Sequence, residues 1–180
     1  HMLFGVATKG LDDAEIDFDS LPPIIRAAWL ASFVEEEDIV DLIHKYDLPV
    51  ECVPTDKRGK EVYRTLINRA GMTWLIRNLG NLGKHGILDD WDDAEFVTSR
   101  LQDRDSLRKS RVHPISILNA LKTFASGKGL RGSGTWDVNQ DVVDALDSAF
   151  YNAFENVEPT GQRILLAVDV SGSMSTYTVN

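Results

Sequence analysis

The amino-acid sequence predicts a mainly α-helical fold, in which stacked helical hairpins form part of an α-solenoid and one strand of an α/β domain follows. Short segments with apolar residues at three- and four-residue steps recur over residues 20–156, and prolines or glycines separate them. Later, five consecutive apolar residues, Ile164 to Val168, suit a strand buried on both faces. We therefore expect a helical region over residues 1–162 and the start of a second domain over 163–180.

Three helices are expected before residue 70. Residues 1–19 are rich in acids and show no clear period, so this segment is expected to be poorly ordered. The first helix begins around Pro22 and Pro23. The second follows the acidic turn of residues 35–38, whose charges suit the positive end of a helix dipole. The third is expected over about 60–69.

Four further helices are predicted, beginning at Thr73, Ala94, Pro114 and Gln140. The first of these is expected to be broken near its end by Gly80, Gly83 and Gly86, because glycine weakens a helix. The last, ending at about Asn156, has the strongest amphipathic pattern of the chain.

The charge of the chain is unevenly distributed. The formal net charge is −9 over 180 residues, which by itself argues against a nucleic-acid partner. Residues 57–131 nevertheless hold fifteen basic and eight acidic residues, and the flanking segments are acidic. Such a basic segment can bind a polyanion, although solvated helix faces have the same composition. No apolar run reaches the ~20 residues of a membrane helix, so no membrane partner is expected.

An acid and two hydroxyls follow the predicted strand on alternate residues. Asp169, Ser171 and Ser173 stand where α/β sheets bind their ligands, beyond the carboxyl end of a strand. Oxygen donors of this kind suit a hard divalent cation such as Mg²⁺. An ordinary polar turn has the same composition, and a complete octahedral site needs further oxygen donors.

The sequence contains no recognisable catalytic arrangement, so the chain is expected not to be an enzyme. Cys52, the only cysteine, has no activating neighbour, and a single cysteine fits a cytoplasmic location. His44 and His85 lack companions at metal-binding spacing. Residues 127–134 are rich in glycine but lack the lysine–hydroxyl ending of a phosphate-binding loop.

His113 stands directly before a predicted helix and close to three cations, Arg108, Lys109 and Arg111. A histidine in this position can stack on a base or contact a phosphate. It can equally form a local hydrogen bond at the start of the helix. The sequence leaves both interpretations open.

Four stretches match motifs of a known family. Residues 74–82 read WLIRNLGNL, residues 111–114 read RVHP, and residues 127–132 read GKGLRG. These resemble, in order, the L-x-R-N-L-G, R-[IV]-H-P and G-x-G-L-R-G motifs of the TROVE module, found in the Ro autoantigen and its bacterial relatives. Residues 165–174, LLAVDVSGSM, resemble the opening of a von Willebrand factor A domain.

The resemblance implies HEAT-like helical hairpins followed by only the first strand and metal loop of a von Willebrand A domain. It also implies an RNA-binding component of a Ro-type ribonucleoprotein. Such a component binds small structured Y-like RNA and single-stranded 3′ ends of misfolded RNA for quality control, and an exoribonuclease can be tethered through the RNA. No DNA partner is expected. The implied polar and cationic contacts to RNA are Arg77, Lys84, Arg108, Lys109, Arg111, His113, Lys128 and Arg131.

A protein-interaction module is the alternative function. Von Willebrand A domains bind a partner's carboxylate through their cation, and helical solenoids present concave protein-binding faces. The acidic flanks of the chain favour this alternative, because they repel RNA.

Overall fold

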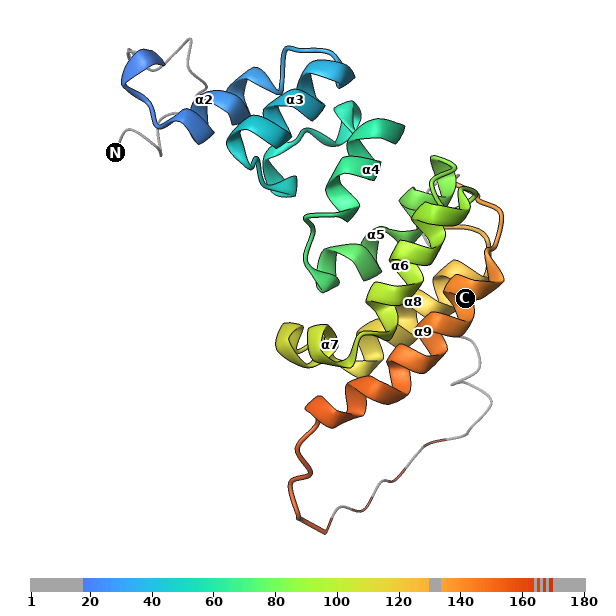
Figure 1. The fold of residues 1–180 in the computed structure, drawn as a ribbon. Helices are drawn as coiled ribbons and strands as arrows, with labels where there is room; N and C mark the ends of the chain where they lie inside the picture. The colour runs from blue at the N-terminus through green and yellow to red at the C-terminus, as the bar shows by residue number, and fades with distance from the viewer. Residues whose placement is uncertain (1–17, 130–133, 164, 166, 168, 170–180) are drawn as a thin grey trace. The chain divides into compact units, whose positions relative to one another are not determined.

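A computed structural model describes residues 18–129 and 134–163 together with residues 165, 167 and 169. This part of the chain is mainly helical (Figure 1), which confirms the predicted fold class. Its α-helices are α2 (Pro23–Leu30), α3 (Glu36–Tyr46), α4 (Lys60–Ile67), α5 (Met72–Lys84), α6 (Trp91–Gln102), α7 (Arg104–Ser110), α8 (Pro114–Ala125) and α9 (Gln140–Asn152). Its 3₁₀ helices are η1 (Phe18–Ser20), η2 (Val50–Cys52), η3 (Thr55–Lys57) and η4 (Ala153–Asn156).

The chain divides into two compact units, His1–Ala70 and Gly71–Asn180. This division falls within the helical region predicted over residues 1–162, and the predicted boundary at residue 162 stays a prediction. Among the described residues, no helix is long and apolar enough to cross a membrane.

The first unit is built around α3, which packs against α2 and α4. Ile39 and Ile43 of α3 are buried at a four-residue step, as the predicted apolar face requires. Val62 and Leu66 of α4 are buried at the same spacing. The two helices therefore bring together matching apolar stripes.

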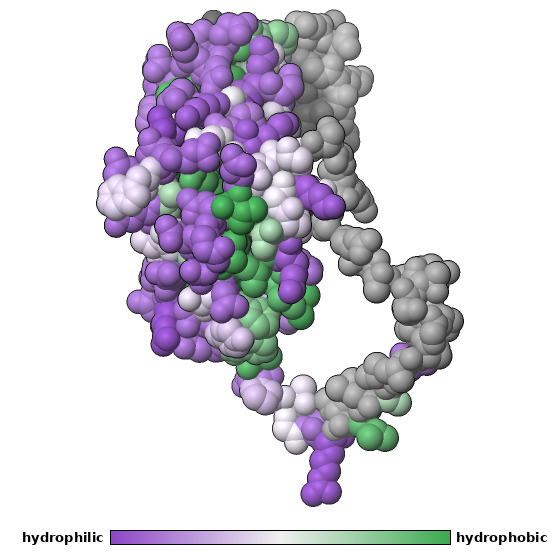
Figure 2. All heavy atoms as spheres, turned by 90° about the vertical axis from the view of Figure 1, so that its right-hand side faces the viewer, coloured by the Kyte–Doolittle hydropathy of each residue, from purple (hydrophilic) through white to green (hydrophobic). Residues whose placement is uncertain are grey.

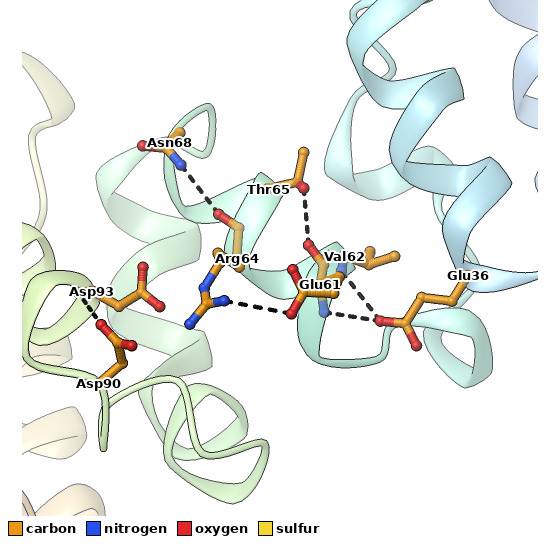
Figure 3. Close-up of polar contacts among 8 residues, drawn as sticks. All are labelled: Glu36, Glu61, Val62, Arg64, Thr65, Asn68, Asp90 and Asp93. Atoms are coloured by element: carbon orange, nitrogen blue, oxygen red, sulfur yellow. Dashed lines mark hydrogen bonds and ion pairs between the residues drawn. The ribbon is translucent and has the colours of Figure 1, made fainter.

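The start of α4 is held by a side chain from α3. The Glu36 carboxylate accepts hydrogen bonds from the backbone N–H groups of Glu61 (2.9 Å) and Val62 (3.4 Å), as Figure 3 shows. These are N–H groups that a helix N-terminus leaves without an intrahelical partner. Gly59 permits the approach, because a Cβ at that position would lie 1.9 Å from Glu36 Oε2.

In the second unit, α9 packs against α6 and α8, and α8 also contacts α5. The short η4 follows α9 directly and contacts α7. Core side chains of this unit include Leu75, Leu79, Leu82, Ile87, Leu88, Val97, Leu101, Ile117, Phe124, Val142 and Leu146. Not all apolar residues are covered: on the face shown in Figure 2, a band of hydrophobic residues is bordered by hydrophilic ones.

Helix α5 is longer than the sequence predicts. It continues through Gly80 and Gly83 to Lys84, where a break was expected. A Cβ at Gly80 would lie 2.8 Å from Trp136 Cη2, and one at Gly83 would lie 3.0 Å from Trp136 Cβ. The two glycines therefore form a seat for Trp136, whose Nε1 donates a hydrogen bond to the Phe124 carbonyl (3.0 Å). Packing against the tryptophan offsets the low helix propensity of glycine.

The region predicted as one helix over residues 94–104 contains the boundary between two helices. Helix α6 begins earlier, at Trp91, because the Asp90 carboxylate accepts hydrogen bonds from the N–H groups of Asp92 and Asp93. Asp103 has an extended backbone and ends α6. Its carboxylate accepts from the Asp105 N–H and so starts α7, a helix that the sequence analysis missed.

The predicted strand over residues 164–168 lies only partly within the described residues. Leu165 and Ala167 have no regular secondary structure, and Leu165 is 94% exposed instead of buried. A strand requires a neighbouring strand for its backbone groups, and the described residues contain none. Residues 164, 166 and 168 lie outside the described part of the chain, as do residues 1–17 of the segment 1–19 that was predicted to be poorly ordered; residues 18 and 19 belong to η1.

Candidate nucleic-acid interface

Four of the predicted RNA contacts line one groove of about 550 Å³ in the second unit. The groove lies between the end of α7, the start of α8 and the end of η4. It is lined by Arg108, Lys109, Arg111, His113, Pro114, Asn156 and Val157, and we call it the α7 groove. The first five of these residues are close in sequence, whereas Asn156 and Val157 come from more than forty residues later.

Buried residues on either side of the cations fix the shape of the α7 groove. Leu107 and Val112 are 1% and 5% exposed, so they anchor the end of α7 and the connection to α8 in the core. The Asn156 side-chain amide donates a hydrogen bond to the Leu107 carbonyl (3.3 Å) and holds η4 against α7. Arg108, Lys109 and Arg111 are all exposed. The fold therefore turns the apolar residues inward and the cations toward solvent.

Arg111 adopts a left-handed backbone conformation directly after α7, with φ 51° and ψ 34°. Its N–H donates a hydrogen bond to the Arg108 carbonyl (3.2 Å). Glycine is the usual residue at such a position, and the left-handed conformation costs another residue roughly 1–2 kcal/mol. Within the described residues the Arg111 side chain forms no ion pair that would offset this cost.

His113 caps helix α8. Its Nδ1 accepts a hydrogen bond from the Ile115 N–H (3.2 Å), which is the local hydrogen bond of one of the two interpretations that the sequence left open. In the neutral ring an accepting Nδ1 places the proton on Nε2. Because the side chain is exposed, the Nε2–H group of His113 is available as a donor at the groove.

The α7 groove is electropositive. Among the described residues, its lining contains three cations and no acid. Arg108 Nη2 lies 3.8 Å from Asp105 Oδ1, but both side chains are more than two-thirds exposed, so solvent screens this pair strongly. Arg108 and Lys109 also stand in the last turn of α7, where a cation stabilises the negative end of the helix dipole. Arg111 lies beyond that turn.

The other predicted RNA contacts lie elsewhere in the second unit. Arg77 lines a pocket between α5 and α8. Lys84 lines a third hollow together with Asp89 and Asp137, whose charges oppose its own. Lys128 forms an antiparallel bridge with Thr135. Arg131 lies outside the described residues, so the described candidates occupy several places instead of one surface.

The predicted magnesium ligands are mostly outside the described part of the chain. Asp169 is described and exposed, whereas Ser171 and Ser173 are not described. Where residues are described, no group of three His, Cys, Asp or Glu side chains is placed to hold a metal ion. Magnesium binding therefore stays a prediction.

Two lining residues of the groove were missed by sequence reasoning. Asn156 is the predicted end of the helix that begins at Gln140, and Val157 follows it; neither was among the predicted RNA contacts. Their role depends on the contact between η4 and α7, which no local pattern shows. Val157 is 40% exposed, and Tyr151 and Phe154 nearby in the chain are 66% and 50% exposed. Exposed apolar and aromatic side chains near cations are typical of single-stranded nucleic-acid sites.

Comparison with known proteins shows what the chain is similar to. Residues 50–126 match the family model of the TROVE domain. The chain is 51% identical over 136 residues to "RNA-binding protein RO60" of Deinococcus radiodurans, and 45% identical over 143 residues to the protein of that name from Caenorhabditis elegans. These matches cover 74% and 78% of this chain, but only 26% and 22% of the relatives. The chain thus spans about a quarter of their length.

A solved structure is similar as well. The crystal structure of the Deinococcus radiodurans RO (RSR) protein matches with a TM-score of 0.79 and 42% sequence identity. The match covers 95% of this chain and 35% of that protein.

Proposed function

Because the chain belongs to the TROVE family of Ro-type proteins, we propose that it is an RNA-binding part of such a protein and that the α7 groove contacts the RNA. The observation that carries this proposal is the gathering of Arg108, Lys109 and Arg111 around one groove, whose lining contains no acid in the part of the chain that the structure describes. The names of the two curated relatives, both RNA-binding proteins, support it.

The groove residues suit the RNA backbone better than a particular base sequence. Arginine and lysine side chains attract phosphates, and arginine can bind one with two parallel hydrogen bonds. The Nε2–H of His113 adds a donor for a phosphate oxygen or a 2′-hydroxyl. Contacts of this kind give affinity that falls as salt rises.

The proposal extends to the kinds of RNA that are bound. We expect small structured Y-like RNA and single-stranded 3′ ends of misfolded RNA, with an exoribonuclease as a partner reached through RNA. The family resemblance supports these ligands. On the same basis we expect Asp169, Ser171 and Ser173 to contribute to a magnesium site, with other oxygen donors completing it.

A salt series tests the proposed role of the groove. Fluorescence anisotropy would measure the affinity of the chain for a labelled single-stranded RNA decamer between low and moderate salt. The triple variant Arg108→Gln/Lys109→Gln/Arg111→Gln is expected to bind more weakly. Its slope of log affinity against log salt should be shallower by about 2, since each single-strand phosphate contact contributes roughly 0.7.

The matched control is Lys45→Gln/Lys60→Gln/Lys122→Gln, which removes three exposed cations outside the α7 groove. This variant has the same net charge as the groove variant. Equal slopes and affinities for the two triple variants would show that only overall charge matters, and would refute the groove as the site of contact.

A further inference from the structure

The second unit contains another pocket, of about 360 Å³, which lies between α5 and α8. Helix α5 contributes Arg77, Leu79, Gly80 and Asn81, among others, and α8 contributes Ser116, Asn119, Ala120 and Thr123. Phe124, Gly129 and Trp136 complete the pocket, which we call the α5–α8 pocket. None of its lining residues lines the α7 groove.

The α5–α8 pocket has an apolar floor and a polar rim. Leu79 and Phe124 are each 1% exposed and lie at the bottom, and Trp136 is only partly exposed. Arg77, Asn81 and Asn119, at the rim, are exposed. The arrangement matches a flat ligand with apolar faces and a polar edge.

Hydrogen-bonding groups at the rim remain available to a ligand. Asn81 donates one hydrogen bond to Asn78 Oδ1 (3.1 Å), which leaves its own carbonyl oxygen free to accept. In the described part of the chain, the side chains of Asn119 and Arg77 have no hydrogen-bond or ion-pair partner. The rim therefore presents amide donors, amide acceptors and one guanidinium group to solvent.

We infer that the α5–α8 pocket holds one unstacked nucleobase of single-stranded RNA, with Arg77 on an adjacent phosphate. This inference rests on the proposed RNA binding and adds a second subsite to it. An asparagine amide can form paired hydrogen bonds with the edge of a base, and apolar side chains cover the base faces. The volume of the α5–α8 pocket is near the lower end of the range for small-molecule pockets, which suits one flat group.

The lining also discriminates against other ligands. Where the lining is described it contains no acid, so a lysine or arginine side chain of a partner protein would find no opposite charge there. A base within a duplex has its polar edge paired and its faces stacked, so it cannot enter without leaving the helix. The pocket is therefore expected to favour unpaired nucleotides.

An abasic oligonucleotide tests this inference, because it keeps the phosphates and removes the bases. Anisotropy would compare the affinity of the chain for an adenine-containing RNA decamer with that for an abasic decamer of the same length. The wild-type chain is expected to bind the base-containing decamer about tenfold more tightly, which is the effect of one well-held base. Equal affinities would overturn the nucleobase site and leave RNA binding by the α7 groove intact.

Two variants in α8 test whether the preference for the base-containing decamer arises in the α5–α8 pocket. Ala120→Leu fills the pocket and should remove most of the preference for the base-containing decamer, with the affinity for the abasic decamer unchanged. Ala125→Leu adds the same volume at an exposed position of the same helix outside the pocket, and should keep the full preference. If both variants keep it, the base is held elsewhere and the inference is wrong. If the wild-type chain binds neither decamer, the proposed function fails first.

Discussion

Helices α3 and α7 end with the same backbone conformation but in different surroundings. Each is followed by a non-glycine residue in the left-handed region, Asp47 after α3 and Arg111 after α7, both with φ of 51°. Asp47 forms an ion pair with Arg69, which follows α4 in the same unit. Arg111 has no such partner within the described residues and lines the α7 groove instead.

The difference in partners indicates different roles for Asp47 and Arg111. Aspartate tolerates the left-handed conformation better than most residues, and its ion pair is a reason internal to the fold. Arginine has neither advantage, so the cost of its conformation is not offset by a contact in its own unit. A strained residue that the fold does not explain is an indicator of function. We therefore assign Arg111 to ligand binding and Asp47 to structure.

Two further arginines of the first unit, Arg58 and Arg64, have contacts within the fold, as Asp47 does. Arg58 donates hydrogen bonds to the carbonyl groups of Val53 and Val50, with Nε and Nη2 each lying 3.0 Å from one of these oxygens. Arg64 pairs with Glu61 of the same helix at 3.5 Å. These cations belong to the basic segment over residues 57–131, yet their visible roles are within the fold.

Truncation of a buried core side chain in α7 or α3 is expected to have the largest effect on the free energy of unfolding. Leu107→Ala in α7 and Ile43→Ala in α3 should each lower the free energy of unfolding by about 2–5 kcal/mol, because each leaves a cavity in the core. Leu107→Ala should also weaken RNA binding by loosening the groove. Urea denaturation and RNA anisotropy measure the two effects. Equal losses of RNA affinity in both variants would break the comparison.

Removal of the left-handed side chains is expected to have a smaller effect. Asp47→Ala should lower the free energy of unfolding by about 1 kcal/mol, because the exposed ion pair and the tolerance of aspartate for this conformation are both lost. Arg111→Ala should change it by less than about 0.5 kcal/mol, since alanine bears the same backbone cost. Urea denaturation of both variants gives the answer. A larger loss for Arg111→Ala would show that its side chain supports the fold.

The N-termini of α7 and α3 should differ in how much stability they lose in acid. A hydrogen bond from the Ser106 hydroxyl holds the pKa of Asp103 below its ordinary value. Desolvation opposes this lowering, and backbone N–H groups and Lys109 add to it. Glu35, before α3, makes no capping hydrogen bond through its side chain. A carboxyl whose pKa is lowered by folding contributes stability above its unfolded pKa, about 3.9, and loses it as the pH falls through the folded value.

Asp103→Asn is therefore expected to lose less stability than the wild-type chain on acidification below about pH 4. Glu35→Gln serves as the control and should follow the wild type. Thermal melts monitored by circular dichroism at a series of pH values measure the difference. Parallel acid profiles for all three proteins would show that the Asp103 cap contributes no pH dependence.

The sequence predicted the parts of the fold that depend on local pattern. Prolines and acids at helix starts identified α2, α3 and α8, and the apolar period identified α9. The break expected in α5 was wrong because Trp136, more than fifty residues away in the chain, packs on Gly80 and Gly83. The seven residues of α7 are too few to show a clear period. Both cases depend on tertiary contacts that a local pattern does not contain.

For the candidate site, too, a local pattern identified residues but not the tertiary contacts between them. Arg111 and His113 belong to the R-[IV]-H-P motif, and Arg108 and Lys109 lie close to it in sequence, so a local pattern was enough to find all four. Their convergence with Asn156 depends on the hydrogen bond to the Leu107 carbonyl. Arg77 was predicted from its motif, but its pocket is formed only where α8 packs against α5.

We propose that the Arg111 side chain serves RNA binding and not folding. Replacement of the left-handed residue by glycine tests it most directly, with Arg111→Gly compared with Asp47→Gly. In both variants, relief of backbone strain opposes the loss of a charge and of chain stiffness, so the free energy of unfolding should change by less than about 1 kcal/mol.

The deciding measurement is the affinity of the two glycine variants for a single-stranded RNA decamer at low salt, made on samples whose stability has been measured by urea denaturation. We predict that Arg111→Gly binds about fivefold more weakly than the wild type, equivalent to ~1 kcal/mol, and that Asp47→Gly binds equally well. An Arg111→Gly variant that binds RNA as tightly as the wild type would contradict the account.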